Sequence, residues 1–397
     1  MQKGEILPHT YSRRRFLQGL GATGFLAALT ACTGVPEVRV KGLPSQSVWV
    51  TYPTGTGTYN DVAAIANMVT DRSGMRVRLM TSNNGIGRLG PVISGTAQYA
   101  RTGDEYFYAF NADDEYASEN WGPQKIRQIW APVGNYGVLV RKDSGIRGVS
   151  DLKGKKYPRL ISSTSMNRKL EAILHFGGLT VDDVEWVDIA YSEQAEAMKT
   201  GQIDAMYQNV VGATIEELNT EYPIHWLDLG GGTPEQYSTW EELAPNVIPG
   251  EFSNAVGQKP GETCTNMQYS IPIVTTSDQP KEEVAAIIDL LVKHYGDYKD
   301  STADAHRFSD EKVLLTPMVV PFHEASVEHF KKIDRWSPDL QRRQDALLEH
   351  ERLLHEAWPG FWEENKKADN PAALWKEWKK KNLPPLPPVN DVSAPKV

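Results

Sequence analysis

Cysteine is nearly absent from this chain, whose 397 residues include only Cys32 and Cys264. The nine histidines show no His-x-His or His-x-x-x-His spacing, and no Gly-x-Ser-x-Gly sequence occurs. The chain therefore lacks the ligand spacing of a transition-metal centre and the nucleophile turn of the α/β-hydrolases. From these absences we expect no metal, no cofactor and no enzymatic activity.

Long apolar runs and excess positive charge are also missing. No segment after residue 31 is apolar enough to span a bilayer, which takes about 20 residues. The formal net charge is −9 at pH 7. An acidic balance argues against nucleic acid and against anionic membrane surfaces as partners, although a cleft can still attract an anion through its local field.

The first 31 residues have the layout of a signal peptide, with arginines at 13–15 followed by a short apolar stretch. Paired arginines before Phe16-Leu17 resemble the twin-arginine export signal. The stretch ends in Leu29-Thr30-Ala31-Cys32, which resembles the lipobox of bacterial lipoproteins. We expect lipidation of Cys32 and a location in the periplasm or at the outer face of the cytoplasmic membrane; the alternative is a plain signal peptide. Cys264 then has no disulfide partner, and we expect it to be a small buried residue.

Strands and helices alternate along the rest of the chain, which predicts an α/β fold. We expect a linker over residues 33–46, a first lobe over 47–142, a second lobe over 143–267 and a return to the first lobe over 268–330. Residues 230–261, rich in Pro and Gly, are expected to form surface loops. Two crossings, near Arg141 and Met267, would place a hinge and a cleft between the lobes.

The last part of the chain, residues 331–397, predicts a helical extension with a proline-rich tail. Leu347, Leu354, Trp358 and Phe361 share one helical face. Two interpretations are open: these side chains dock the helices on a lobe, or they form an exposed face for a membrane partner.

Small polar residues follow several predicted strands, at the edge where open α/β sheets bind ligands. The turn at 54–58 combines glycines, threonine hydroxyls and the start of a helix, a combination that suits a carboxylate. Each turn can also be read as an ordinary cap or turn. The candidate ligand-binding residues are Thr54, Gly55, Thr56, Thr58, Asn83, Asn84, Gly85, Asp104, Thr164, Asn167, Tyr207 and Gln208.

Several segments resemble the TAXI solute receptors of TRAP transporters, which have the type II periplasmic-binding-protein fold. They are residues 52–59 (YPTGTGTY), 140–146 (VRKDSGI), 151–155 (DLKGK), 178–184 (GLTVDDV) and 201–205 (GQIDA). The resemblance implies a receptor that holds a small organic acid, such as an amino- or oxo-dicarboxylate, between two lobes and passes it to a TRAP-type permease. It implies ligand contact at the turns named above.

Two other functions remain open at this point. A binding protein of the same fold could report its ligand to a signalling partner in place of a permease. An enzyme on the same fold would need a compact His, Cys or carboxylate cluster, which the sequence does not suggest.

Overall fold

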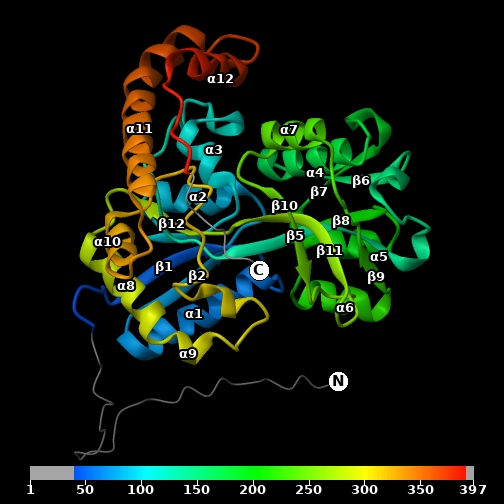
Figure 1. Ribbon diagram of the computed structural model, residues 1–397, viewed down its shortest axis with the longest axis horizontal. Coiled ribbons are helices and arrows are strands. Elements are labelled where there is room, and N and C mark those ends of the chain that lie inside the picture. Colours follow the sequence, from blue (N-terminus) through cyan, green and yellow to red (C-terminus); the bar gives the residue numbers. More distant parts are fainter. Residues whose placement is uncertain (1–39, 390–397) are drawn as a thin grey trace, which may run out of the picture. The chain divides into compact units, whose positions relative to one another are not determined.

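The computed structural model describes residues 40–389 and divides them into two lobes with separate hydrophobic cores (Figure 1). The predicted signal peptide, Cys32 and the first part of the linker lie outside the described residues. Cys264 is buried, as predicted, and burial raises the pKa of its thiol. None of the helices between residues 40 and 389 is long and apolar enough to cross a membrane.

The first lobe is built on a five-stranded sheet with the order β2-β1-β3-β12-β4. β1 runs parallel to β2 and β3, whereas β12 is antiparallel to β3 and β4. The strands are β1 (Gln46–Thr51), β2 (Arg76–Thr81), β3 (Tyr99–Arg101), β4 (Ile126–Trp130) and β12 (Ile273–Thr276). The helices are α1 (Gly57–Ser73), α2 (Gly85–Ile93), α3 (Glu105–Asn111), α8 (Lys281–Lys293), α9 (Tyr295–Tyr298) and α10 (Glu324–Lys332), with 3₁₀ turns η1 (Asp114–Tyr116) and η6 (Ala305–Phe308).

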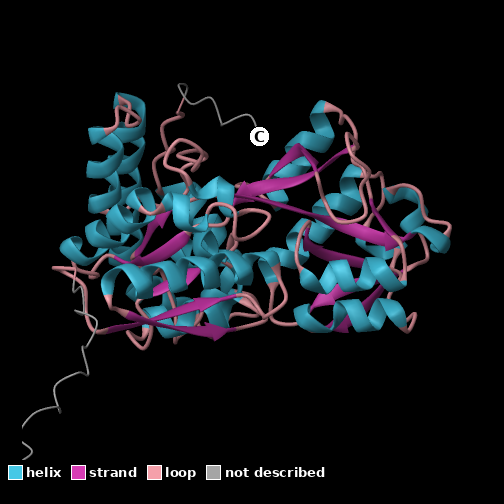
Figure 2. Cartoon of the chain, turned by 90° about the horizontal axis from the view of Figure 1, so that it is seen from below, coloured by secondary structure: helices cyan, strands magenta, loops and turns pink. Residues whose placement is uncertain are grey.

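The second lobe holds a sheet of order β10-β11-β5-β8, with β9 also paired to β5, and a separate parallel pair β6-β7. Helices lie on both sides of the strands (Figure 2). The strands are β5 (Val133–Arg141), β6 (Lys156–Leu160), β7 (Glu185–Ile189), β8 (Ala205–Asn209), β9 (Ile224–Trp226), β10 (Ile248–Ser253) and β11 (Thr263–Ser270). The helices are α4 (Thr164–Phe176), α5 (Gln194–Lys199), α6 (Ala213–Glu221) and α7 (Pro234–Leu243), with 3₁₀ turns η2 (Lys142–Ser144), η3 (Val149–Leu152), η4 (Val181–Asp183) and η5 (Tyr191–Glu193).

The chain passes between the lobes at two short segments, and their positions differ from our expectation. We placed residues up to 142 in the first lobe, but β5 pairs with β8 and β11 of the second. The crossings therefore lie between β4 and β5 and between β11 and β12. Each contains a proline, Pro132 or Pro272, which has no N–H to continue a strand ladder.

We had expected residues 230–261 to form surface loops, but this stretch also contains regular secondary structure. It contains α7 and the edge strand β10. α7 begins with a capping box between Thr233 and Gln236 and a proline in its first turn. β10 carries Pro249 and Gly250, which hide the strand pattern in the sequence but are tolerated at a sheet edge.

The C-terminal extension consists of α11 (Pro338–Asn365) and α12 (Pro371–Asn382), which we call the arm. In Figure 1 the arm is drawn in orange and red, with α12 near α3. Leu347, Leu354 and Trp375 are fully buried in the core of the first lobe. The interpretation that the apolar face docks the helices on a lobe is confirmed for Leu347 and Leu354, and Trp375 of α12 docks in the same core.

Candidate ligand-binding cleft

The turns that follow the strands of the first lobe meet the second lobe directly. Three of the turns predicted from the sequence take part through four contacts, and three of these contacts have ordinary hydrogen-bond lengths. They are Thr214 N to Gly55 O (3.1 Å), Thr58 Oγ1 with Tyr136 Oη (2.8 Å), Ser192 N to Asn83 Oδ1 (3.1 Å), and the ion pair between Lys169 and Asp104.

Beside these turns lies a group of buried polar atoms that have no hydrogen-bond partner within residues 40–389. We call this group the polar cluster. Buried polar groups are nearly always hydrogen bonded, so six unpaired atoms in one region indicate a binding site for a polar ligand. They are Tyr52 Oη, Arg88 Nη2, Thr102 Oγ1, Asp104 Oδ2, Glu105 Oε2 and Tyr116 Oη.

Arg88 and Glu105 form the centre of the polar cluster. Arg88 Nε lies 2.5 Å from Glu105 Oε1, and the guanidinium carbon lies 3.9 Å from the centre of the Tyr52 ring. Burial raises the pKa of Glu105, but the charge and hydrogen bond of Arg88 outweigh burial, so this pKa lies below its ordinary value. The pair therefore stays ionised, and each partner keeps one atom free of hydrogen bonds to the described residues.

Two glycines give the cluster its close packing. A Cβ at Gly103 would lie 2.5 Å from Tyr52 Oη and 2.8 Å from Glu105 Oε2. A Cβ at Gly85 would lie 2.6 Å from Tyr116 Oη. A side chain at either position would displace polar atoms of the cluster, which explains the need for glycine there.

Lys169, on α4, extends into this region from the second lobe. Its ammonium forms an ion pair with Asp104, and both side chains are only 1% exposed. The same ammonium lies 5.1 Å from the centre of the Tyr269 ring. Two cations, Arg88 and Lys169, thus balance two anions, Asp104 and Glu105, and the formal charge of these four residues is zero.

Four buried tyrosines of the second lobe lie on its side of the contact with the first lobe, and we call them the tyrosine wall: Tyr136, Tyr191, Tyr207 and Tyr269. Their rings contact one another, with Tyr136 stacked on Tyr207 at 5.6 Å between ring centres. Tyr207 Oη lies 2.9 Å from Tyr269 Oη. Burial raises the pKa of Tyr136 to about 12, so its hydroxyl is neutral and can donate a hydrogen bond.

The remaining predicted residues, apart from Thr54, pack against other side chains or form part of local structure. Tyr207 belongs to the tyrosine wall, Gly85 packs against Tyr116, and Gln208 accepts a hydrogen bond from Tyr191. Thr56 caps α1, Asn84 caps α2, and Thr164 is the first residue of α4. Asn167 forms two hydrogen bonds with the backbone of Leu160, at 2.8 and 2.9 Å. Thr54 is exposed.

The role of Thr56 can be tested by substitution. Its hydroxyl accepts from Tyr59 N and donates to Pro53 O, so it acts as a helix cap. We expect Thr56→Val to lower the free energy of unfolding by about 1 kcal/mol and Thr56→Ser to have little effect. Denaturant unfolding measures both. A loss of ligand affinity in Thr56→Val without a loss of stability would instead favour direct ligand contact.

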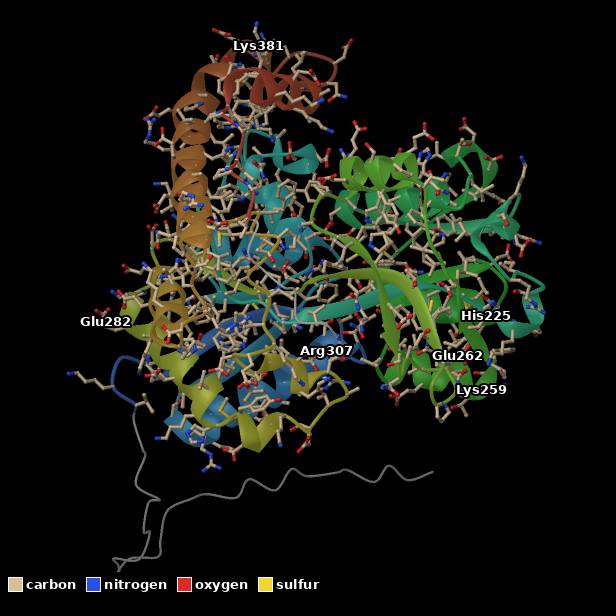
Figure 3. The ribbon with its side chains drawn as sticks, in the orientation of Figure 1. His225, Lys259, Glu262, Glu282, Arg307 and Lys381 are labelled. Atoms are coloured by element: carbon tan, nitrogen blue, oxygen red, sulfur yellow. The ribbon has the colours of Figure 1, made fainter. Side chains whose placement is uncertain are left out.

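A second group of buried charges holds both crossing segments, and we call it the hinge cluster: Asp61, Arg101, Asp304 and Arg307. Arg101 donates to the Ile271 carbonyl, and Arg307 lies 2.8 Å from the side-chain amide of Asn135, at the start of β5. In Figure 3 Arg307 lies at the boundary between the lobes. Burial and the nearby Asp304 raise the pKa of Asp61 to about 7.

Sequence reasoning missed Arg88, Glu105, Lys169 and most of the tyrosines. One signal was available for Lys169, because it lies on the helical face that also carries Met166, Leu170 and Ile173. A lysine on the apolar face of a helix must find a buried partner. Within the described residues, no group of three or more His, Cys, Asp or Glu side chains is placed to hold a metal ion.

Comparisons with known proteins give one family match and several distant structural likenesses. A model of the NMT1-like family matches residues 51–333. The alkanesulfonate-binding protein SsuA from Xanthomonas axonopodis pv. citri, bound to MOPS, is 15% identical, with 78% of this chain and 94% of that chain covered and a TM-score of 0.40. R. palustris Rpa4515 with adipate is 13% identical, with 73% and 93% covered and a TM-score of 0.46.

Proposed function

The chain belongs to the NMT1-like family, and we propose that it is an extracytoplasmic solute-binding receptor. It captures a small organic acid between its lobes and delivers it to a membrane permease, without catalysing a reaction. The observation that carries this proposal is the polar cluster, whose unpaired atoms lie where the strand-end turns of the first lobe meet the second lobe.

The chemistry of the polar cluster favours an amino acid over an oxo-acid. Arg88 Nη2 is a free donor that suits a ligand carboxylate, and no described residue accepts its hydrogen bond. Asp104 Oδ2 and Glu105 Oε2 are free acceptors that need donors, which an ammonium group supplies. An oxo-dicarboxylate has no such donors and would bring like charge toward both carboxylates. We therefore propose an amino-dicarboxylate or a related zwitterion.

The resemblance to TAXI receptors supports a TRAP-type permease as the partner, and the lipobox-like residues ending at Cys32 support a lipid anchor in the periplasm. Both are parts of the proposal. Closure of the lobes would bury the ligand from both sides, since the contacts between the lobes form at the same turns that would hold it.

Native mass spectrometry of the protein as purified tests the function. We expect one small molecule per chain, released on denaturation and identified as an acid that carries an amino group. Titration calorimetry with that compound should show saturable one-site binding. Failure to find a bound molecule, together with no binding of any amino acid or dicarboxylate in a panel, would overturn the proposal.

A further inference from the structure

The turn between α3 and η1 has an unusual backbone. Ala112 and Asp114 both have a φ of +52°, a left-handed conformation that side chains with a Cβ disfavour. Two such residues in one three-residue turn persist only where surrounding contacts hold them. The turn therefore depends on its neighbours.

The arm supplies those contacts. Trp375 Nε1 and Lys379 Nζ both donate to the Asn111 carbonyl, at 2.8 and 3.0 Å. His350 Nε2 lies 3.0 Å from Asn111 Oδ1, and Lys379 Nζ lies 2.5 Å from Asp113 Oδ1. Four polar contacts from two arm helices thus fix the start of the turn.

On its other side the same turn contacts the second lobe. Asp114 accepts two hydrogen bonds from Arg168, at 2.5 and 2.8 Å, in a bidentate pair that joins η1 to α4. Arg168 precedes Lys169, whose ammonium pairs with Asp104 in the cleft. Two adjacent acids therefore face two different parts of the molecule: Asp113 faces the arm and Asp114 faces the second lobe.

The arm, the turn and the second lobe also share one cavity. Its volume is about 350 Å³, and its walls include Asp113 and Asp114 from the first lobe, Arg168 from the second and Lys376 from the arm. Lys379 is only 11% exposed beside it. The arm, the turn and the second lobe therefore lie close enough for the contact between the arm and the turn to influence the contact between the turn and the second lobe.

We propose that Lys379 is a positioning residue for ligand capture, which acts by holding the turn so that Asp114 meets Arg168 when the lobes close. The proposal rests on the proposed receptor function. Docking of the arm and closure of the lobes are then linked, and each stabilises the other by the same factor. The arm therefore contributes to closure of the lobes, although it does not contact the polar cluster.

Hydrogen exchange of the protein without added ligand tests this link. Lys379→Met keeps the aliphatic stem and removes the charge, whereas Lys379→Arg restores a donor. We expect Lys379→Met to speed exchange in residues 111–116 and also in residues 164–176 of the second lobe, with recovery in Lys379→Arg. Lys380→Met is the matched control, since Lys380 is an exposed neighbour whose ion pair within residues 40–389 is with Glu377.

Binding of L-glutamate provides the second readout. We expect about a 10-fold loss of affinity in Lys379→Met, within the usual range of coupling between sites. Removing Arg168 as well, as Lys379→Met/Arg168→Met, should add little to Arg168→Met alone. The proposal would be overturned if Lys379→Met sped exchange only in α12 and the turn. It would also be overturned if the affinity losses of Lys379→Met and Arg168→Met were additive in the double variant.

The two hypotheses fail in different ways. If the unmodified protein binds neither L-glutamate nor any co-purified acid, the receptor function fails, and the exchange comparison still decides the role of Lys379. If the unmodified protein binds and the exchange of α4 is unchanged by Lys379→Met, only the role of the arm is overturned.

Discussion

Replacing Arg88 by methionine is expected to lower the free energy of unfolding by about 3–5 kcal/mol. Arg88 is fully buried, and its removal leaves the Glu105 carboxylate buried without a counter-ion. Without the guanidinium, burial is the largest remaining influence on Glu105, and we expect it to raise the pKa of this carboxyl. The folded variant would then bind a proton more tightly than the unfolded chain, so its stability falls as the pH rises above the ordinary pKa of glutamate.

Denaturant unfolding at pH 5 and pH 8 measures this effect, with a larger deficit expected at pH 8. The double variant Arg88→Met/Glu105→Gln should recover part of the loss, since it leaves no carboxylate at position 105 without a counter-ion. Arg72→Met is the matched control: Arg72 pairs with Asp297 at the surface, and we expect a change of about 0–1 kcal/mol. Equal losses for Arg88→Met and Arg72→Met would show that the Arg88–Glu105 pair is not buried as described.

Replacing Lys169 by methionine is expected to weaken ligand binding by about 30-fold or more, equivalent to roughly 2 kcal/mol. The substitution removes the buried ion pair that joins α4 to the first lobe and leaves Asp104 without its counter-ion. Because the pair forms only when the lobes are together, the closed state should lose more stability than the open state.

Titration calorimetry with the co-purified acid and small-angle scattering measure the two parts of this effect. Binding should weaken, and the unliganded variant should have a larger radius of gyration than the unmodified protein. Lys153→Met serves as the control, because Lys153 pairs with Asp183 on the surface of the same lobe. Unchanged affinity in Lys169→Met would contradict a role for this pair in capture.

Much of the fold could be predicted from the sequence because local patterns were strong. The apolar spacing from Lys281 to Lys293 is regular enough to predict a helix from the sequence alone, and α8 has these bounds, with Pro280 before it. The boundary between the lobes was misplaced because β4 and β5 are both buried and only two residues separate them. Only strand pairing separates them, and pairing is a tertiary property.

The site was predicted only in part. Polar turns were found because hydroxyl and amide side chains stand out at strand ends, and Thr58, Asn83 and Asp104 do contact the second lobe. Arg88 was missed because an arginine on a short helix usually indicates a solvent-exposed position. Its burial depends on Glu105, 17 residues away, and on Tyr52 from the turn after β1, and no local pattern records these partners.

The place of β12 in the first sheet sets the order in which the newly made chain can fold. The second lobe is one uninterrupted stretch from Val133 to about Ile271, so all its strands are synthesised before β12. The first sheet needs β12 between β3 and β4, and its core also needs Trp375 from the arm. The half of the molecule that is synthesised first is therefore the half that is completed last.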